Sequence, residues 1–97
     1  MSGQTSVSIF MGSKSDLSIL QFASDILKEF NITHNMFILS AHRTPEEVVK
    51  KIKESEANGV QVFIAAAGMA AHLAGAIAAQ TTKPVLGIPL GGGDLDG

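Results

Sequence analysis

The chain has 97 residues, enough for one compact domain and too few for two. Hydrophobic residues make up 45% of it and charged residues only 16%, so the composition is that of a folded chain and excludes disorder. The net charge of −2, with no run of basic residues and no Trp or Tyr, argues against a general nucleic-acid binder. Because Cys is absent, disulfides, a thiol nucleophile and thiolate-bound metals are excluded.

Nothing in the sequence predicts a membrane partner. Residues 1–8 lack the basic start and apolar run of a signal peptide. No uninterrupted apolar stretch approaches the roughly 18 residues that a membrane span needs. We therefore expect a cytoplasmic protein.

The first half of the chain alternates apolar runs with helical periodicity. Residues 7–11 form a short apolar run that predicts a strand, and residues 17–30 predict a helix. A second strand is predicted over residues 36–39. The apolar side chains that recur at helical spacing, and that we expect to face the core, are Leu17, Leu20, Ala23, Leu27 and Phe30.

The second half continues this alternation. A second helix is expected to open at Thr44 and to end at Asn58-Gly59. Residues 60–66 predict a third strand, residues 70–80 a third helix and residues 84–88 a fourth strand. In the second helix we expect an apolar face and a charged face, formed by Val48, Val49 and Ile52 and by Lys50, Lys51, Lys53, Glu54 and Glu56.

Apolar strands that alternate with helices are typical of a parallel sheet covered on both faces. The predicted fold is therefore a doubly wound α/β domain of three layers, a single domain over residues 1–97, truncated after the fourth strand. The third helix is apolar on nearly every side and built from small residues. We expect it to pack on more than one face, with a subunit interface as the simplest cover.

Ligands of such sheets bind beyond the carboxyl ends of the strands, where helix N-termini also point. The first segment in such a place, residues 12–16, combines Gly12, the hydroxyls of Ser13 and Ser15, and a helix N-terminus that favours an anion. It matches neither the P-loop nor the GxGxxG pattern. A capping box between Ser13 and Asp16 explains the same residues equally well.

The second segment, residues 40–45, contains two side chains that helix initiation does not explain. Thr44 and Pro45 suit the first positions of a helix, and Glu47 completes a capping box. His42 and Arg43 have no such role. They set a group that titrates near neutrality beside a fixed cation able to bind phosphate or carboxylate.

The third segment, residues 67–72, is a turn of small residues in which Gly68 allows close approach of a ligand. His72 is either functional or a hydrogen-bonded core residue. His34 precedes an edge-like strand without polar neighbours, so we expect it to be structural or exposed. The three His lie far apart and form no HxxxH or HExxH pattern, so no metal is expected. The residues alone thus favour His acid–base catalysis on a phosphorylated small molecule.

Four motifs resemble one known family. The sequences MGSKSD at 11–16, SAHRTP at 40–45, AGMAAHLAG at 67–75 and PVLGIP at 84–89 are similar to the PurE family, the 5-(carboxyamino)imidazole ribonucleotide mutases of purine biosynthesis. The resemblance extends along essentially the whole chain. It implies a flavodoxin-like sheet, a homo-octamer, and an isomerase that yields 4-carboxy-5-aminoimidazole ribonucleotide without any cofactor.

The resemblance also implies roles for individual residues. Ser13, Ser15 and Arg43 would hold the phosphate, and Asp16 would accept the ribose hydroxyls beside Gly12. The substrate's imidazole would lie over Ser40, Ala41 and His42. Residues 68–73 would wall the pocket for the migrating carboxyl group, and its members proposed for binding are Gly68, Ala70, Ala71 and Leu73.

In the implied reaction His42 acts twice. As an imidazolium it protonates the carbamate nitrogen and releases carbon dioxide into a closed, dry pocket. The electron-rich ring carbon then attacks the carbon dioxide, and neutral His42 removes the ring proton. His72 would assist by orientation or hydrogen bonding.

Two other functions stay open. A related class carboxylates aminoimidazole ribonucleotide directly and tends to carry Lys after the His, so Arg43 favours the mutase. A phosphate-binding remnant without catalysis is the other alternative, because the family's chains continue through a further helix, strand and C-terminal helix. Met69 and Ala74 stand where many relatives have Gly and Pro, which changes the shape of the carbon dioxide pocket.

Overall fold

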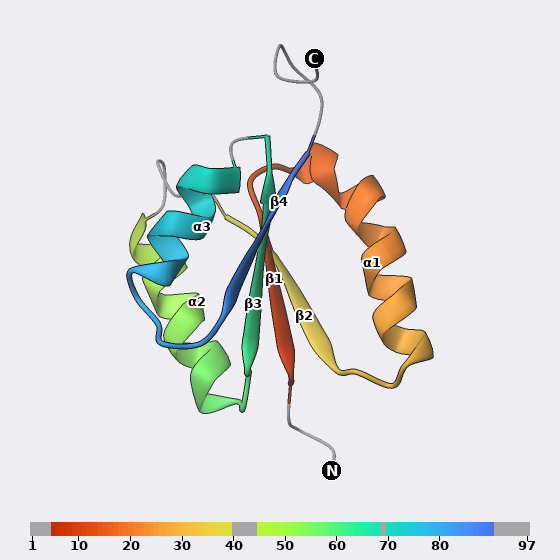
Figure 1. The fold of residues 1–97 in the computed structure, drawn as a ribbon, viewed down its shortest axis with the longest axis horizontal. Helices are drawn as coiled ribbons and strands as arrows, with labels where there is room; N and C mark the ends of the chain where they lie inside the picture. The colour runs from red at the N-terminus through yellow and green to blue at the C-terminus, as the bar shows by residue number, and fades with distance from the viewer. Residues whose placement is uncertain (1–4, 40–44, 69, 91–97) are drawn as a thin grey trace.

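The computed structural model describes residues 5–39, 45–68 and 70–90. Within them, four strands form one parallel sheet in the order β2-β1-β3-β4, with three α-helices packed around it (Figure 1). The strands are β1 (Val7–Met11), β2 (His34–Ile38), β3 (Val62–Ala67) and β4 (Val85–Pro89). The helices are α1 (Leu17–Glu29), α2 (Pro45–Ala57) and α3 (Ala70–Ala78), with a short 3-10 turn over Lys14–Asp16.

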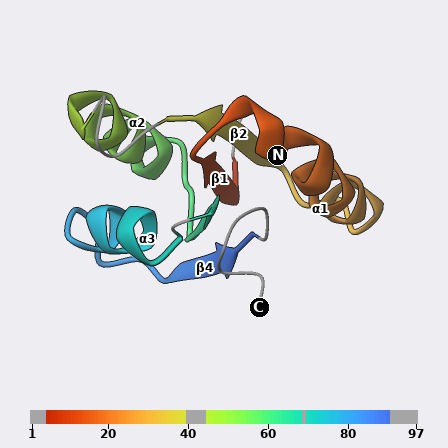
Figure 2. The same cartoon turned by 90° about the horizontal axis from the view of Figure 1, so that it is seen from above.

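The helices lie on both faces of the sheet. Seen from above, α1 covers one face, and α2 and α3 lie together on the other (Figure 2). The predicted doubly wound, flavodoxin-like α/β fold of three layers is therefore confirmed. No helix among the described residues is long and apolar enough to cross a bilayer.

Each face of the sheet has its own core. On the side of α2 and α3, Phe10 and Phe63 from the sheet pack in one cluster with Ile52 and Ile77, and all four are 0% exposed. The ring of Phe10 meets the rings of Phe37 and Phe63 edge to face, with centroids 5.4 and 6.0 Å apart. On the side of α1, a smaller cluster consists of Ile9, Met11, Leu20 and Ala66.

Most of the predicted inward faces are confirmed. Leu20, Val48 and Ile52 are buried, and Gly59 ends α2 at a φ of 94°, a value that favours glycine. Lys51 is only half-buried on the predicted solvent face, because its ammonium lies 5.4 Å from the centre of the Phe37 ring.

Two predicted core residues of α1 are exposed instead. Leu17 is 37% exposed and Phe30 is 70% exposed, so their assignment to the core is wrong. Leu17 is the first residue of α1, and Phe30 lies just beyond its last residue. The buried residues of this helix are Leu20 and Ser24, a stripe that contains a polar side chain.

Candidate functional site

The segments that follow β1, β2 and β3 leave the sheet at one edge, because the three strands are parallel and β1 lies between the other two. The backbone N–H of Leu39 donates to the carbonyl of Met11 at 2.9 Å. The N–H of Gly12 donates to the carbonyl of Ala66 at 3.3 Å. The carboxyl ends of β2 and β3 are thus hydrogen-bonded to the carboxyl end of β1. The three segments that follow these strands therefore begin at the same end of the sheet, as the sequence predicted.

The turn after β1 is held by its own polar groups. The backbone N–H of Ser13 donates to Oδ2 of Asp16 at 3.2 Å, and the predicted capping box between these residues is present. The hydroxyls of Ser13 and Ser15 lie 2.6 Å apart, and both side chains are exposed. The turn therefore presents two hydroxyls to solvent, while one of its N–H donors is already used by Asp16.

Gly12 is required by a close approach to β3. A Cβ at Gly12 would lie 3.1 Å from the Cβ of Ala67, tighter than ordinary contact. We expect Gly12→Ala to lower the free energy of unfolding in urea by about 1–3 kcal/mol through overpacking. Gly68→Ala is the matched control, because among the described residues, its chain neighbours aside, no atom lies within 4 Å of its added Cβ. A loss of the same size in both variants would contradict the steric explanation.

The third segment, residues 67–72, contains exposed residues and leads directly into a residue of the core. Gly68 and His72 are exposed, so the alternative that His72 is a core residue is wrong for this chain. Leu73, the next residue, is only 4% exposed and belongs to the core cluster of α2 and α3. Ala70 is the first residue of α3 and Ala71 the second. Leu73 is thus held by the core one residue after the exposed His72.

Four predicted site residues lie outside the described part of the chain. They are Ser40, Ala41, His42 and Arg43, and Met69 lies outside it too. Their roles stay predictions, although Leu39 fixes where their segment leaves the sheet. Among the residues that the structure does describe, no group of three or more His, Cys, Asp or Glu is placed to hold a metal ion.

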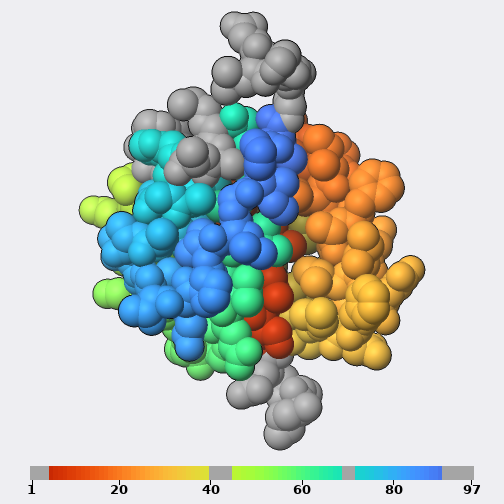
Figure 3. Space-filling view, in the orientation of Figure 1, coloured from red at the N-terminus to blue at the C-terminus, as the bar shows by residue number. Residues whose placement is uncertain are grey.

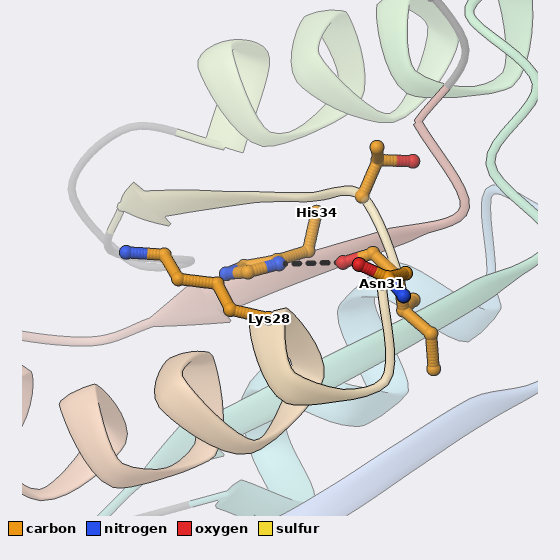
Figure 4. A pocket seen from close by; sticks show the side chains of 5 residues that line it. Lys28, Asn31 and His34 are labelled. Carbon is orange, nitrogen blue, oxygen red and sulfur yellow. Dashed lines mark hydrogen bonds between the residues drawn. The ribbon is translucent and has the colours of Figure 1, made fainter. Parts of the chain in front are cut away.

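A separate hollow of about 390 Å³ lies at the opposite end of the sheet, where β2 begins (Figure 4). It is lined by Lys28, Asn31, Ile32, Thr33 and His34. Nδ1 of His34 lies 3.1 Å from the carbonyl of Ile32, and Nε2 lies 2.7 Å from the hydroxyl of the buried Ser24. A carbonyl only accepts, so Nδ1 carries the proton and, in the neutral ring, Nε2 accepts from Ser24.

This arrangement corrects the expectation that His34 has no polar neighbours. The ring joins α1 to the edge strand β2. We expect His34→Ala to lower the unfolding free energy by about 1–3 kcal/mol, because the Ser24 hydroxyl loses its partner while it stays buried. Ser24→Ala combined with His34→Ala should cost less than the sum of the single changes, measured by urea unfolding. Strict additivity would show that the two side chains do not stabilise each other.

The fold and the site define a class, a flavodoxin-like α/β protein with its candidate residues at the carboxyl edge of a parallel sheet. The AIR carboxylase family matches residues 6–97. The chain belongs to this family.

Named relatives agree with this assignment. The N5-carboxyaminoimidazole ribonucleotide mutase of Escherichia coli K12 is 50% identical over 91 residues, which are 94% of this chain and 54% of that protein. The phosphoribosylaminoimidazole carboxylase of Schizosaccharomyces pombe is 48% identical over 91 residues, 94% of this chain and 16% of that one. The chain thus spans about half the length of the mutase.

A solved structure gives the same result in three dimensions. A crystal structure of a substituted PurE2 from Treponema denticola superposes with a TM-score of 0.83 and 31% sequence identity. The superposition covers 92% of this chain and 57% of that protein. The fold described here therefore corresponds to about half of a PurE subunit.

Proposed function

We propose that this chain carries the substrate-binding edge of a 5-(carboxyamino)imidazole ribonucleotide mutase, an isomerase of purine biosynthesis. The proposal rests on one observation. The chain leaves β1, β2 and β3 at the same end of the sheet, and backbone hydrogen bonds join the end of β1 to the ends of β2 and β3. This arrangement brings the two hydroxyls of Ser13 and Ser15 to the same end of the sheet as Leu39, the last described residue before the segment that contains His42. Residues 1–97 would form one domain, a portion of the complete family domain.

In this proposal the substrate's phosphate lies against the turn after β1. Ser13 and Ser15 offer adjacent exposed hydroxyls. Because Asp16 already accepts the N–H of Ser13, the hydroxyls need a cation beside them to hold a phosphate. Arg43 would supply it, and the half-buried Asp16 would accept ribose hydroxyls with its remaining oxygen.

His42 would move the proton between nitrogen and carbon. Protonation of the carbamate nitrogen breaks its bond to the carboxyl group and leaves carbon dioxide and the neutral amine. The neighbouring ring carbon forms the new bond to carbon dioxide, and its proton returns to His42. Gly68, Ala70, Ala71 and Leu73 would wall the space that keeps carbon dioxide from escaping, with His72 orienting the substrate. No cofactor enters this sequence of steps.

The proposal is tested with both ribonucleotides as substrates. We expect the carboxyamino compound to be converted to the 4-carboxy compound, and the reverse, in the absence of bicarbonate, followed by liquid chromatography. Efficient turnover of aminoimidazole ribonucleotide at low bicarbonate would favour the direct carboxylase instead. Binding of both ribonucleotides without conversion would favour a phosphate-binding remnant. Neither binding nor conversion would overturn the proposal.

Arg43 should act mainly on binding. We expect Arg43→Ala to weaken substrate binding by roughly 10–150-fold, the loss of one charge-assisted contact of about 1.5–3 kcal/mol. The measurement is the dissociation constant by isothermal titration calorimetry. Lys53→Ala is the control, because Lys53 is an exposed cation of α2 and no part of the proposed site. An unchanged dissociation constant for Arg43→Ala would contradict the phosphate role.

The proposed assembly and compartment follow from the same family. A homo-octamer is supported by α3, an apolar helix whose Gly75 and Ala78 are exposed in the single chain. We propose the cytoplasm as the compartment, in line with the absence of Cys. A small-molecule ribonucleotide would be the ligand, with no nucleic acid or membrane as partner.

A further inference from the structure

Two consecutive residues near the end of α2, Ser55 and Glu56, make polar contacts with other elements. The hydroxyl of Ser55 lies 2.8 Å from the hydroxyl of Ser8 in β1, and these residues are 1 and 0% exposed. The carboxylate of Glu56 accepts a hydrogen bond from the hydroxyl of Thr81, in the connection between α3 and β4. We call these four residues the α2 clamp. They join the last turn of α2 to β1 and to that connection.

The contact between Glu56 and Thr81 reaches a segment that is itself bonded to the sheet. The hydroxyl of Thr81 also accepts the backbone N–H of Lys83 at 3.1 Å. The carbonyl of Pro84 accepts the N–H of Phe63 in β3 at 2.9 Å. In the space-filling view, the blue connection between α3 and β4 lies against the green end of α2 (Figure 3). The clamp therefore ties α2 to two parts of the sheet layer.

The other contacts of α2 specify its position along the sheet less sharply. Val48 and Ile52 pack in the apolar cluster, and apolar contact has no preferred direction. Between the start of α2 and the end of α3 a hollow of about 190 Å³ remains. An O–H···O hydrogen bond, in contrast, is kept only over roughly 2.5–3.0 Å. The clamp thus limits sliding of α2 along the sheet more than its apolar face does.

The clamp lies at the end of α2 that is distant from the candidate site, because α2 runs antiparallel to the strands (Figure 1). Ser8 precedes Met11, the last residue of β1, by about 10 Å of strand. Ser55 follows Pro45, the first residue of α2, by about 15 Å of helix. Measured from the clamp, the start of α2 therefore reaches the carboxyl end of β1, where the candidate site begins.

Strand β1 holds both flanks of residues 40–44. Before this segment, the N–H of Leu39 donates to the carbonyl of the last residue of β1 at 2.9 Å. After it, α2 is bonded to the same strand through the clamp. The turn over residues 12–16 also follows β1 directly. A slide of α2 along β1 would therefore move one flank of residues 40–44 relative to this turn.

We propose that the α2 clamp positions the start of α2, and with it the segment that contains His42, for the proton transfers of the proposed isomerase. The inference rests on the proposed function. The clamp residues lie at the other end of α2, so they are positioning residues and not catalytic ones. Because misplacing a reacting group by roughly 1 Å can lower a rate by about 10²-fold, a small slide of α2 is enough to matter.

The main variant removes both buried hydroxyls, by Ser8→Ala together with Ser55→Ala. Neither hydroxyl is left without a partner, so the midpoint of urea unfolding should change little. We expect the single-turnover rate of interconversion to fall at least about fivefold and the dissociation constant of the substrate to change less than about twofold. The turn that would hold the phosphate is not part of α2, and the long side chain of Arg43 can follow a small shift.

Ile52→Val is the matched control, because it removes one buried carbon from the same face of α2 and leaves the clamp intact. It should lower the urea midpoint and keep the wild-type rate. A merely structural role of the clamp predicts the reverse, a rate that follows stability. As a second variant, Glu56→Ala should slow the reaction, whereas Glu56→Gln should keep the rate, since its amide oxygen still accepts from Thr81.

A second measurement needs no substrate. Because the chain has no Cys, Lys14→Cys places a single nitroxide spin label in the turn after β1. Paramagnetic relaxation enhancement of the amide signals of Glu46 and Glu47 falls steeply with distance, so it reports where the start of α2 lies relative to that turn. We expect the enhancement to change in the double serine variant and to stay as in wild type in Ile52→Val.

A wild-type rate or an unchanged relaxation enhancement in the double serine variant would overturn the proposal. Equal slowing by Ile52→Val would overturn it too, since the rate would then follow stability. If the wild-type chain converts neither ribonucleotide, the proposed function fails, while the relaxation enhancement still decides whether the clamp fixes α2.

Discussion

Replacement of His42 by asparagine is expected to slow the interconversion of the two ribonucleotides by roughly 10²–10⁴-fold, the usual contribution of one general acid–base group. Asparagine keeps a hydrogen-bonding side chain but cannot give and take a proton near neutral pH. Because the proposed reaction needs a proton on nitrogen in one step and removal of a proton from carbon in the other, both steps should slow. The measurement is the single-turnover rate with bound substrate.

Substrate binding and folding separate this effect from a structural one. Position 42 precedes the first residue of α2, so we expect the unfolding free energy to change by less than about 0.5 kcal/mol. The dissociation constant for the substrate should change much less than the rate. His34→Asn, the same chemical change at the other end of the sheet, should leave the rate nearly intact. A wild-type rate in His42→Asn would remove His42 from the mechanism.

The architecture could be predicted because strand and helix signals alternate clearly in the sequence. Apolar runs such as residues 7–11 and 60–66 stand next to segments of helical period, and the structure has strands at Val7–Met11 and Val62–Ala67. The rule that ligands bind at carboxyl ends then selected one end of the sheet for the candidate site, and Gly12 and Leu39 at that end are hydrogen-bonded to neighbouring strands. The specific roles of His42 and Arg43 came from the family resemblance.

Helix α1 shows why the inward faces were harder to predict. It has two candidate stripes, one through Leu20, Ser24 and Leu27 and one through Phe22 and its apolar neighbours. Apolar periodicity predicted the first stripe but extended it to Leu17 and Phe30, which are exposed. It did not predict that Ser24 is buried there, which is possible because the hydroxyl of Ser24 is satisfied by His34 of β2. That contact joins residues ten apart through tertiary structure, so local spacing cannot reveal it.

The second large effect is expected at the centre of the core. Phe10→Ala should lower the free energy of unfolding by about 3–5 kcal/mol, because it removes a fully buried ring and leaves a cavity. Phe10 lies in the central part of the sheet and its ring contacts Phe37 of β2 and Phe63 of β3. Its loss should therefore loosen both strand pairs that position the candidate site.

Phe30→Ala is the matched control, since it makes the same chemical change at a ring that is 70% exposed. We expect it to alter the unfolding free energy by less than about 0.5 kcal/mol, measured by urea denaturation beside Phe10→Ala. A small domain at the lower end of typical stability, about 5 kcal/mol, would keep little of its stability in Phe10→Ala and almost all of it in Phe30→Ala. Equal losses in the two variants would mean that Phe30 is covered in solution. They would also return Phe30 to the core, as the helical period alone predicted.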